Sequence, residues 1–276
     1  MTRRLNIVGG VISVFTVICA VIWAFPLYWA VMTTLKPEDE VVQSGFRLLP
    51  KVWTVAGYFF VLLNTKIGIW YVNSIITSVS VTVLVLVLSA LCGYAISQLR
   101  FAGRGVLWLM ILASFMVPTQ TLIVTHFVLM NDFGLINTLA GVVLPQLIVP
   151  VVLIVYKQFF DSIPKDYREA ALIDGASELQ IFWHVFIRMN WGITTALAII
   201  TFIGAWNNFL WPFIAVTQQE KMNVTVGITQ VDDAFGLAYA RNLSGAVLAA
   251  LPVALAYLIF QRRVTQAIML SAGIKG

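Results

Sequence analysis

The residues that could carry covalent, metal or nucleotide chemistry occur in this 276-residue sequence without the spacing that such chemistry needs. A phosphate loop requires the pattern G-x-x-x-x-G-K-[ST], which the chain lacks. Histidine, cysteine and acidic residues do not cluster at metal-ligand spacing, and no serine or cysteine has an evident histidine partner. Cys19 and Cys92 fall within apolar runs, where we interpret them as small buried hydrophobes. The sequence therefore predicts neither a catalytic site nor a metal site, and it disfavours an intramembrane enzyme.

The elements that must position any functional side chain are long apolar segments. Hydrophobic residues make up 60% of the chain and charged residues 11%, which is too apolar for a soluble domain of this size. Hydrocarbon accepts helices of about 20 apolar residues, because their backbone hydrogen bonds are satisfied internally. We predict an all-α polytopic membrane protein, a single transmembrane domain, with six transmembrane helices near residues 7–35, 71–97, 105–130, 135–156, 191–216 and 243–260.

Lysine and arginine are distributed unevenly between the expected loops. With the N-terminus inside, 11 of the 17 basic residues fall in cytoplasmic segments, and basic loops of membrane proteins stay cytoplasmic. We therefore expect a protein of the inner or plasma membrane with both termini in the cytoplasm. The net charge of +5 then reflects topology and not nucleic-acid binding. A cleaved signal peptide is disfavoured, because the first apolar run is much longer than the roughly 7–15 residues that such peptides use.

The expected spans have no Asp, Glu, Lys or Arg in their middle, and His126 is their only acidic or basic side chain. Ion-coupled carriers use membrane-embedded ionisable groups or unwound ion sites. We interpret His126 as a cavity-lining or interface residue in preference to a proton relay. If ATP drives transport instead, the ATPase must be a separate polypeptide.

The longest expected cytoplasmic connection, residues 157–188, has the pattern of two short helices joined by a tight turn. Ser162 suits the N-cap of the first helix, and Gly175 suits the left-handed conformation at its end. Ser177 and Gln180 have the spacing of a capping box that begins the second helix.

The first of these helices carries a compact, partly apolar surface bordered by charges: Tyr167, Arg168, Glu169, Ala170, Ala171, Leu172 and Asp174. Such a surface suits docking into the groove of a partner protein. An amphipathic helix that lies on the membrane surface has the same pattern, and the residues by themselves favour neither interpretation.

This loop resembles the EAA loop of binding-protein-dependent ABC importers, and within that class it looks most like the sugar permeases. The matching residues are Pro164, Glu169-Ala170-Ala171, Ile173-Asp174-Gly175-Ala176-Ser177 and Gln180-Ile181-Phe182. The resemblance covers nearly the whole chain, and other stretches that fit are Tyr71-Val72-Asn73-Ser74, residues 133–138, Trp206 to Pro212 and Phe260 to Gly276. Together they resemble the second, shorter, six-span permease subunit of the maltose-type class. One departure is that a proline expected in the family is replaced around residues 188–190.

The resemblance implies a transport subunit and not an enzyme. In that class an extracytoplasmic solute-binding protein delivers a carbohydrate, a separate ATPase dimer binds ATP and Mg, and two permease chains form a heterodimer that works by alternating access. No cofactor is expected in this chain. The implied coupling residues are Tyr167, Arg168, Glu169, Ala170, Ala171, Asp174 and Gly175, and the implied ATPase-contacting tail carries Arg262, Arg263 and Lys275.

Polar residues in or near the spans are candidates for the translocation path: Asn73, Gln120, His126, Gln146, Asn207 and Asn208. Sugar hydroxyls need such hydrogen-bond partners. Polar side chains also hold membrane helices together, and that alternative stays open for each residue. For Asn207, beside Trp206, we favour a structural or gating role. Two other classes, a secondary carrier or channel and a membrane scaffold, are separated from an importer by tests of ATP-dependent uptake.

Overall fold

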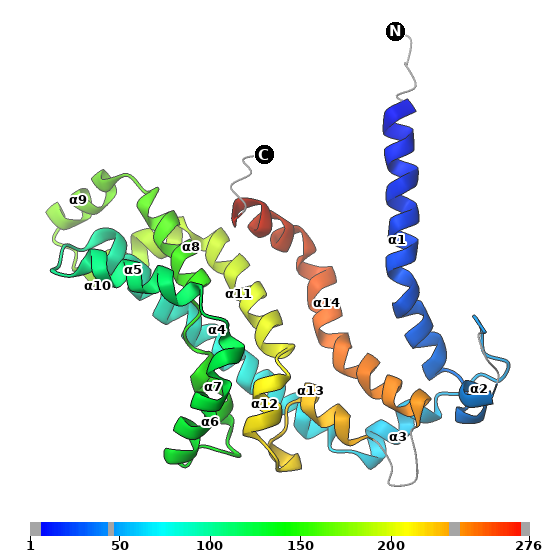
Figure 1. Cartoon of the computed structure of the whole chain (residues 1–276). Helices are drawn as coiled ribbons and strands as arrows, with labels where there is room; N and C mark the ends of the chain where they lie inside the picture. The colour runs from blue at the N-terminus through cyan, green and yellow to red at the C-terminus, as the bar shows by residue number, and fades with distance from the viewer. Residues whose placement is uncertain (1–6, 44–46, 232–237, 272–276) are drawn as a thin grey trace. The chain divides into compact units, whose positions relative to one another are not determined.

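The structure is a computed structural model that describes residues 7–43, 47–231 and 238–271 (Figure 1). These residues form helices joined by turns and loops, with no strand among them. The all-α class expected from the sequence is therefore confirmed.

The chain divides into two compact units. The first unit comprises residues 1–67 and 227–251, and the second comprises residues 68–226 and 252–276. The single transmembrane domain expected over the whole chain stays a prediction.

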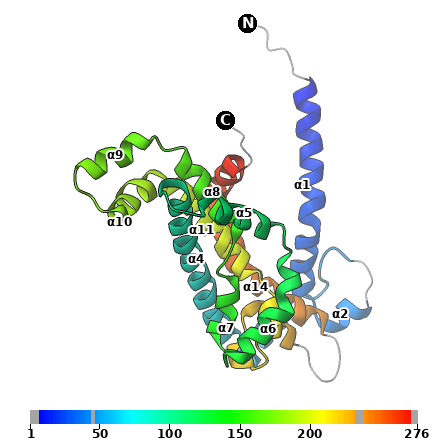
Figure 2. The same ribbon diagram turned by 60° about the vertical axis from the view of Figure 1, so that its left-hand side comes forward.

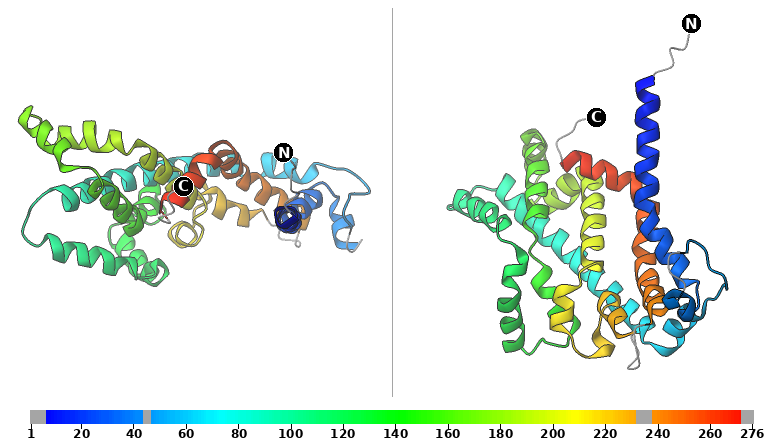
Figure 3. Two further views of the ribbon diagram at one scale, coloured as in Figure 1. Left: turned by 90° about the horizontal axis from the view of Figure 1, so that it is seen from above. Right: turned by 45° about the vertical axis from the view of Figure 1, so that its right-hand side comes forward.

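The first unit begins with a long apolar helix. Its elements are α1 (Ile7–Thr34), α2 (Glu38–Gln43), α3 (Ala56–Asn64), η5 (Ile228–Gln230) and the first part of α14 (Tyr239–Ser271). The helix α1 continues as one ribbon through Pro26 (Figure 3). In the apolar segment Gly9–Thr34 of this helix, 0% of the most hydrophobic stretch is buried within the chain, as expected for side chains that face lipid or another subunit.

Acidic side chains order the short elements of this unit. The Glu38 carboxylate accepts hydrogen bonds from the backbone N–H groups of Tyr239 and Ala240, where a negative charge suits the positive end of α14. The Glu40 carboxylate accepts the backbone N–H of Lys51 at 2.9 Å, which holds the pKa of Glu40 below its ordinary value.

The second unit contains the remaining elements and the end of α14. They are α4 (Ile67–Gln98), α5 (Arg104–Phe115), η1 (Thr119–Leu122), α6 (Ile123–Asp132), α7 (Leu139–Val143), η2 (Leu144–Gln146), α8 (Pro150–Asp161), α9 (Lys165–Ile173), α10 (Glu178–Ile181), the π-helix η3 (Phe182–Ile187), α11 (Trp191–Trp206), α12 (Leu210–Ala215), η4 (Gln219–Lys221) and α13 (Val224–Gly227).

The core of the second unit is an aromatic cluster in which α4, α8 and η3 meet. It consists of Tyr94, Tyr156, Phe160, Phe182 and Phe186, and none of the five is more than 4% exposed. The Tyr94 ring contacts the Phe186 ring edge to face, with centroids 5.0 Å apart. Such aromatic pairs add stabilisation beyond the burial of their area. The cluster therefore fixes η3 on the two long helices.

Among the described residues, three helices are long and apolar enough to cross a membrane by themselves: Gly9–Thr34, Ile67–Gln98 and Tyr239–Gln261. The third and fourth expected spans are each broken by a bend, the fifth is divided between α11 and α12, and a further bend precedes α11. A bend of 95° separates α5 from η1 and α6, one of 50° separates η2 from α8, and one of 83° separates η3 from α11. Six spans result if each bent pair counts as one.

Proline explains two of these breaks. It lacks a backbone N–H and disfavours helical conformation in the preceding residue. Pro150 begins α8 after Val149, which is extended with φ −120° and ψ 92°. Pro118 lies between α5 and η1, and here the proline itself is extended. The departure from the family pattern around residues 188–190 coincides with the third break, since α11 begins at Trp191.

Candidate functional site

The helices α9 and α10 form a hairpin that follows α8 (Figure 2). The helix α8 continues to Asp161, so the connection begins later than residue 157. Ser162 donates its hydroxyl to the carbonyl of Phe159 at 2.7 Å and does not cap α9, whose N-cap is Pro164. The expected cap is wrong because Ser162 lies at the end of the longer α8.

The turn after α9 has the expected left-handed glycine. Gly175 has a φ of +79°, its N–H donates to the carbonyl of Leu172 at 3.1 Å, and the N–H of Ala176 donates to the carbonyl of Ala171 at 3.0 Å. These two bonds form a Schellman motif, which ends a helix sharply.

The capping box that begins α10 is also confirmed. The Ser177 hydroxyl accepts the backbone N–H of Gln180, and the Gln180 side chain accepts the backbone N–H of Ser177 at 2.8 Å. Among the apolar residues of α10 and η3, Phe182 and Phe186 are buried, whereas Leu179 and Trp183 are exposed.

The predicted coupling residues lie together on α9 and the turn that follows it. The exposed ones are Tyr167, Glu169, Ala170, Asp174 and Gly175, and the half-buried ones are Arg168 and Ala171. Sequence reasoning did not include Ile173 among them, although it is the most exposed apolar residue of α9 at 86%. The available signal was an apolar residue directly before Asp174 and Gly175, at the end of the helix.

One polar network ties this hairpin to α4. Arg168 of α9 forms an ion pair with Glu178 of α10, which raises the pKa of Arg168. The same Glu178 carboxylate accepts the hydroxyl of Tyr94 of α4 at 2.5 Å. Tyr94 and Glu178 lie 84 residues apart, so no local pattern in the sequence pointed to their contact.

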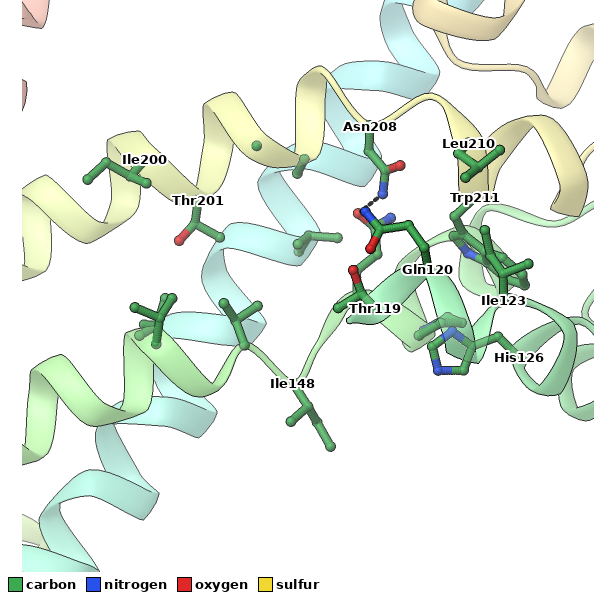
Figure 4. Close-up of a pocket in the computed structure, with 18 residues that line it drawn as sticks. Thr119, Gln120, Ile123, His126, Ile148, Ile200, Thr201, Asn208, Leu210 and Trp211 are labelled. Carbon is green, nitrogen blue, oxygen red and sulfur yellow. Dashed lines mark hydrogen bonds between the residues drawn. The ribbon is translucent and has the colours of Figure 1, made fainter. Parts of the chain in front are cut away.

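A cavity of about 410 Å³ lies among α4, η1, α6, η2, α8, α11 and α12 (Figure 4). Four of the six predicted path residues line it: Gln120, His126, Gln146 and Asn208. Thr119 and Thr201 add hydroxyl groups that sequence reasoning had not included. His126 is the only basic residue in the lining and no lining residue is acidic.

The amides in this cavity also join its walls. Asn208 Nδ2 donates to Gln146 Oε1 at 2.7 Å, and Gln146 Nε2 donates to the carbonyl of Val142 at 2.8 Å. The His126 ring lies edge to face against Trp211, with centroids 5.8 Å apart. The arrangement can offer hydrogen bonds and an aromatic surface to an uncharged polar molecule.

The two other predicted path residues do not line the cavity. Asn73 is 6% exposed and donates to the carbonyls of Glu220 and Met222 at 2.9 and 3.0 Å. Asn207 is an exposed residue between α11 and α12.

The remaining predicted residues are the basic residues of the tail and the two cysteines. Lys275 and the side chains of Arg262 and Arg263 lie outside the described residues. Cys19 and Cys92 are free thiols and half-exposed, so the expectation that they are buried is not met within this chain. Across the described residues, no group of three His, Cys, Asp or Glu side chains could hold a metal ion.

Comparison with known proteins agrees with this architecture. The chain is 33% identical over 252 residues to the diacetylchitobiose uptake system permease protein NgcG of Streptomyces coelicolor, covering 90% of this chain and 83% of that protein. It is 29% identical over 268 residues to the arabinooligosaccharides transport system permease protein AraQ of Bacillus subtilis, covering 96% and 95%. The crystal structure of a bacterial ABC transporter involved in the import of the acidic polysaccharide alginate contains a chain with the same fold, with a TM-score of 0.82, 23% identity and coverage of 95% and 98%. Residues 3–268 match the model of one family, so the chain is a transport subunit of the family of binding-protein-dependent transport system inner membrane components.

Proposed function

We propose that this chain is one of two permease subunits of an ATP-driven importer that translocates a carbohydrate by alternating access. The observation that carries the proposal is the α9–α10 hairpin, which displays a short helix with exposed small and apolar residues on a rigid aromatic base. Relatives named as permeases for arabinooligosaccharides and diacetylchitobiose support the substrate class.

The proposed assembly has four kinds of component. A second permease completes the pore as a heterodimer, and an extracytoplasmic solute-binding protein delivers the sugar. A dimeric ATPase binds ATP and Mg²⁺, since this chain has no phosphate loop. Both termini lie in the cytoplasm, where the tail with Arg262, Arg263 and Lys275 contacts the ATPase dimer.

In this assembly α9 docks on the ATPase. Ile173 and Tyr167, which are 86% and 52% exposed, supply apolar contact area, and the small Ala170 permits close approach. The exposed Glu169 pairs with a basic residue of the ATPase, a contact that favours correct orientation more than affinity.

The cavity forms part of the sugar path. A neutral lining suits a substrate recognised through hydroxyl groups, because amide and hydroxyl side chains both donate and accept hydrogen bonds. Gln146 and Asn208 also join η2 to the end of α11, so their bond combines path lining with helix attachment.

The test uses the whole importer, co-purified and reconstituted in vesicles with its binding protein. The ligand of the binding protein is first identified by a thermal-shift screen of sugars and of non-carbohydrate solutes. Gly175→Asp places a negative charge where a side chain meets no neighbouring atom, and aspartate tolerates a positive φ. We expect it to abolish ATP-driven uptake, whereas Gly175→Asn, of the same shape and neutral, retains uptake. Glu169→Lys, the charge-reversing variant, and Glu169→Gln, its neutral control, form a second pair for the same measurement.

Wild-type uptake in both charged variants would contradict the docking role of α9. Uptake by the chain without an ATPase would show a secondary carrier, and binding of partners without any uptake would show a scaffold. A tight non-carbohydrate ligand of the binding protein would contradict the substrate class.

A further inference from the structure

We infer that Tyr94, Glu178 and Arg168 form a positioning joint that transmits movement of α9 to α4 and thereby to the cavity. The inference rests on the proposed function, in which an ATPase moves α9. Two of its three residues, Tyr94 and Glu178, lie outside the docking surface, and it names the contact through which that movement reaches the membrane helices.

The joint connects three helices through one carboxylate. Glu178, the first residue of α10, accepts the Tyr94 hydroxyl at 2.5 Å through Oε2. Its other oxygen pairs with Arg168 Nη2, and Arg168 Nε lies 3.4 Å from Oε2. A hydrogen bond to an ionised group is shorter and stronger than one between neutral groups. The carboxylate therefore holds α9 and α4 in a fixed relation.

The Tyr94 side chain is held where it is, so it can carry a displacement to its own helix. It is 4% exposed, and its ring contacts Phe160, Phe182 and Phe186 with centroid separations of 6.3, 5.4 and 5.0 Å. A ring packed on several sides cannot turn away when its hydroxyl is pulled. Movement of Glu178 must therefore move α4 or break the hydrogen bond.

The joint is the principal polar attachment of α9. Over the described part of the chain, Arg168 is the only residue of α9 whose side chain forms a hydrogen bond. Nearer the N-terminal end of α4, Val81 lines the cavity. It lies 13 residues before Tyr94, or about 20 Å along a helix that rises about 1.5 Å per residue. A rigid helix can carry a displacement over that distance.

A second group of the same chemistry serves as a comparison. The Ser97 hydroxyl of α4 donates to Asp161 Oδ1 at 2.6 Å, and Asp161 pairs with Lys157. Ser97 lies one turn from Tyr94, but its carboxylate partner and cation both belong to α8. This group attaches α4 to α8 and has no contact with α9, so it should not transmit nucleotide-driven movement.

The experiment measures the response of the cavity to nucleotide in the purified importer, without a sugar. Cysteine is introduced at the cavity residue Thr201 in a Cys19→Ala, Cys92→Ala background, and its maleimide labelling rate is compared with and without Mg–ATP and vanadate. The matched variants are Tyr94→Phe, which keeps the ring and removes the hydroxyl, and Ser97→Ala.

We expect the labelling rate of the parent to depend on nucleotide. Tyr94→Phe should weaken this dependence by roughly tenfold, the size of one hydrogen bond to a charged group, while the ATPase still co-purifies. Glu178→Gln should have the same effect, and the double variant should be no worse than either single one. Ser97→Ala should respond like the parent.

A normal nucleotide response in Tyr94→Phe, or an equal loss in Ser97→Ala, would overturn the joint while leaving the proposed function intact. A parent importer that binds no ATPase, or whose cavity ignores nucleotide, would overturn the proposed function and the joint with it.

Discussion

The two ends of α4 are attached to the rest of their unit by different chemistry. At its N-terminal end Trp70 and Asn73 donate to backbone carbonyls of the segment from 219 to 222, and Ser74 accepts the backbone N–H of Val224 at 2.8 Å. At its C-terminal end Tyr94 and Ser97 donate to carboxylates, each of which is paired with a cation.

The difference indicates which end of α4 is held in place within the unit and which end is coupled to α9. The neutral bonds at the N-terminal end are buried, since Asn73 and Ser74 are 6% and 0% exposed, and breaking them would leave polar groups without partners. The charged groups at the C-terminal end are partly exposed, so water can replace their bonds at lower cost. We interpret the first as a fixed clamp and the second, on its aromatic base, as the joint through which movement of α9 reaches α4.

The largest expected effect comes from that aromatic base. Phe186→Ala removes a fully buried ring, which typically costs about 3 kcal/mol in the free energy of unfolding. Thermal unfolding in detergent measures the loss. The control is Phe115→Ala, whose ring is 58% exposed and which should change stability little. Equal losses in the two variants would show that the cluster is not the base of the joint.

A smaller loss is expected from the clamp. Asn73→Ala leaves the carbonyls of Glu220 and Met222 without this donor, at a cost of about 2 kcal/mol. It should also speed protease cleavage within residues 217–226. Thr82→Ala deletes a hydrogen bond that stays within α4, so it should leave the cleavage rate unchanged. Unchanged cleavage in Asn73→Ala would contradict the clamp.

The capping box should matter less and only locally. Ser177→Ala removes the cap of α10 and should destabilise the hairpin by about 1 kcal/mol. Hydrogen exchange should show faster opening of α10 with little change in α4. Ser162→Ala is the matched control, because its hydroxyl does not cap α9. Equal exchange in both variants would argue against the box as a support of the joint.

The smallest effect is expected at the comparison group. Lys157→Ala removes an ion pair whose carboxylate side chain is 41% exposed, and such pairs contribute less than about 1 kcal/mol. The melting temperature should change little, and what change there is should shrink in high salt. A large, salt-independent loss would mean that this pair is not a weak surface contact and would weaken its use as a comparison.

Local features of this protein followed from the sequence. The apolar runs, the Ser177–Gln180 capping box and the left-handed Gly175 depend on residues close together in the chain, so their types and spacing predicted them. The breaks before Pro118 and Pro150 had a signal too, because proline removes a donor and restricts its neighbour. The break before Trp191, which no proline marks, and the sharpness of all three bends came from the structure.

The tertiary structure decided which polar residues meet. Four predicted path residues converge on one cavity, whereas Asn73, with the same amide chemistry, turns to carbonyls about 150 positions later in the chain. Tyr94 and Glu178 are 84 residues apart, and nothing in either local segment identifies the other as its partner. Hydrogen-bonding capacity is a property of a residue type, but the partner that uses it is chosen by how distant helices pack. The sequence by itself therefore determined the apolar segments and the turn of the hairpin, and only packing determined the bends, the cavity, the clamp and the joint.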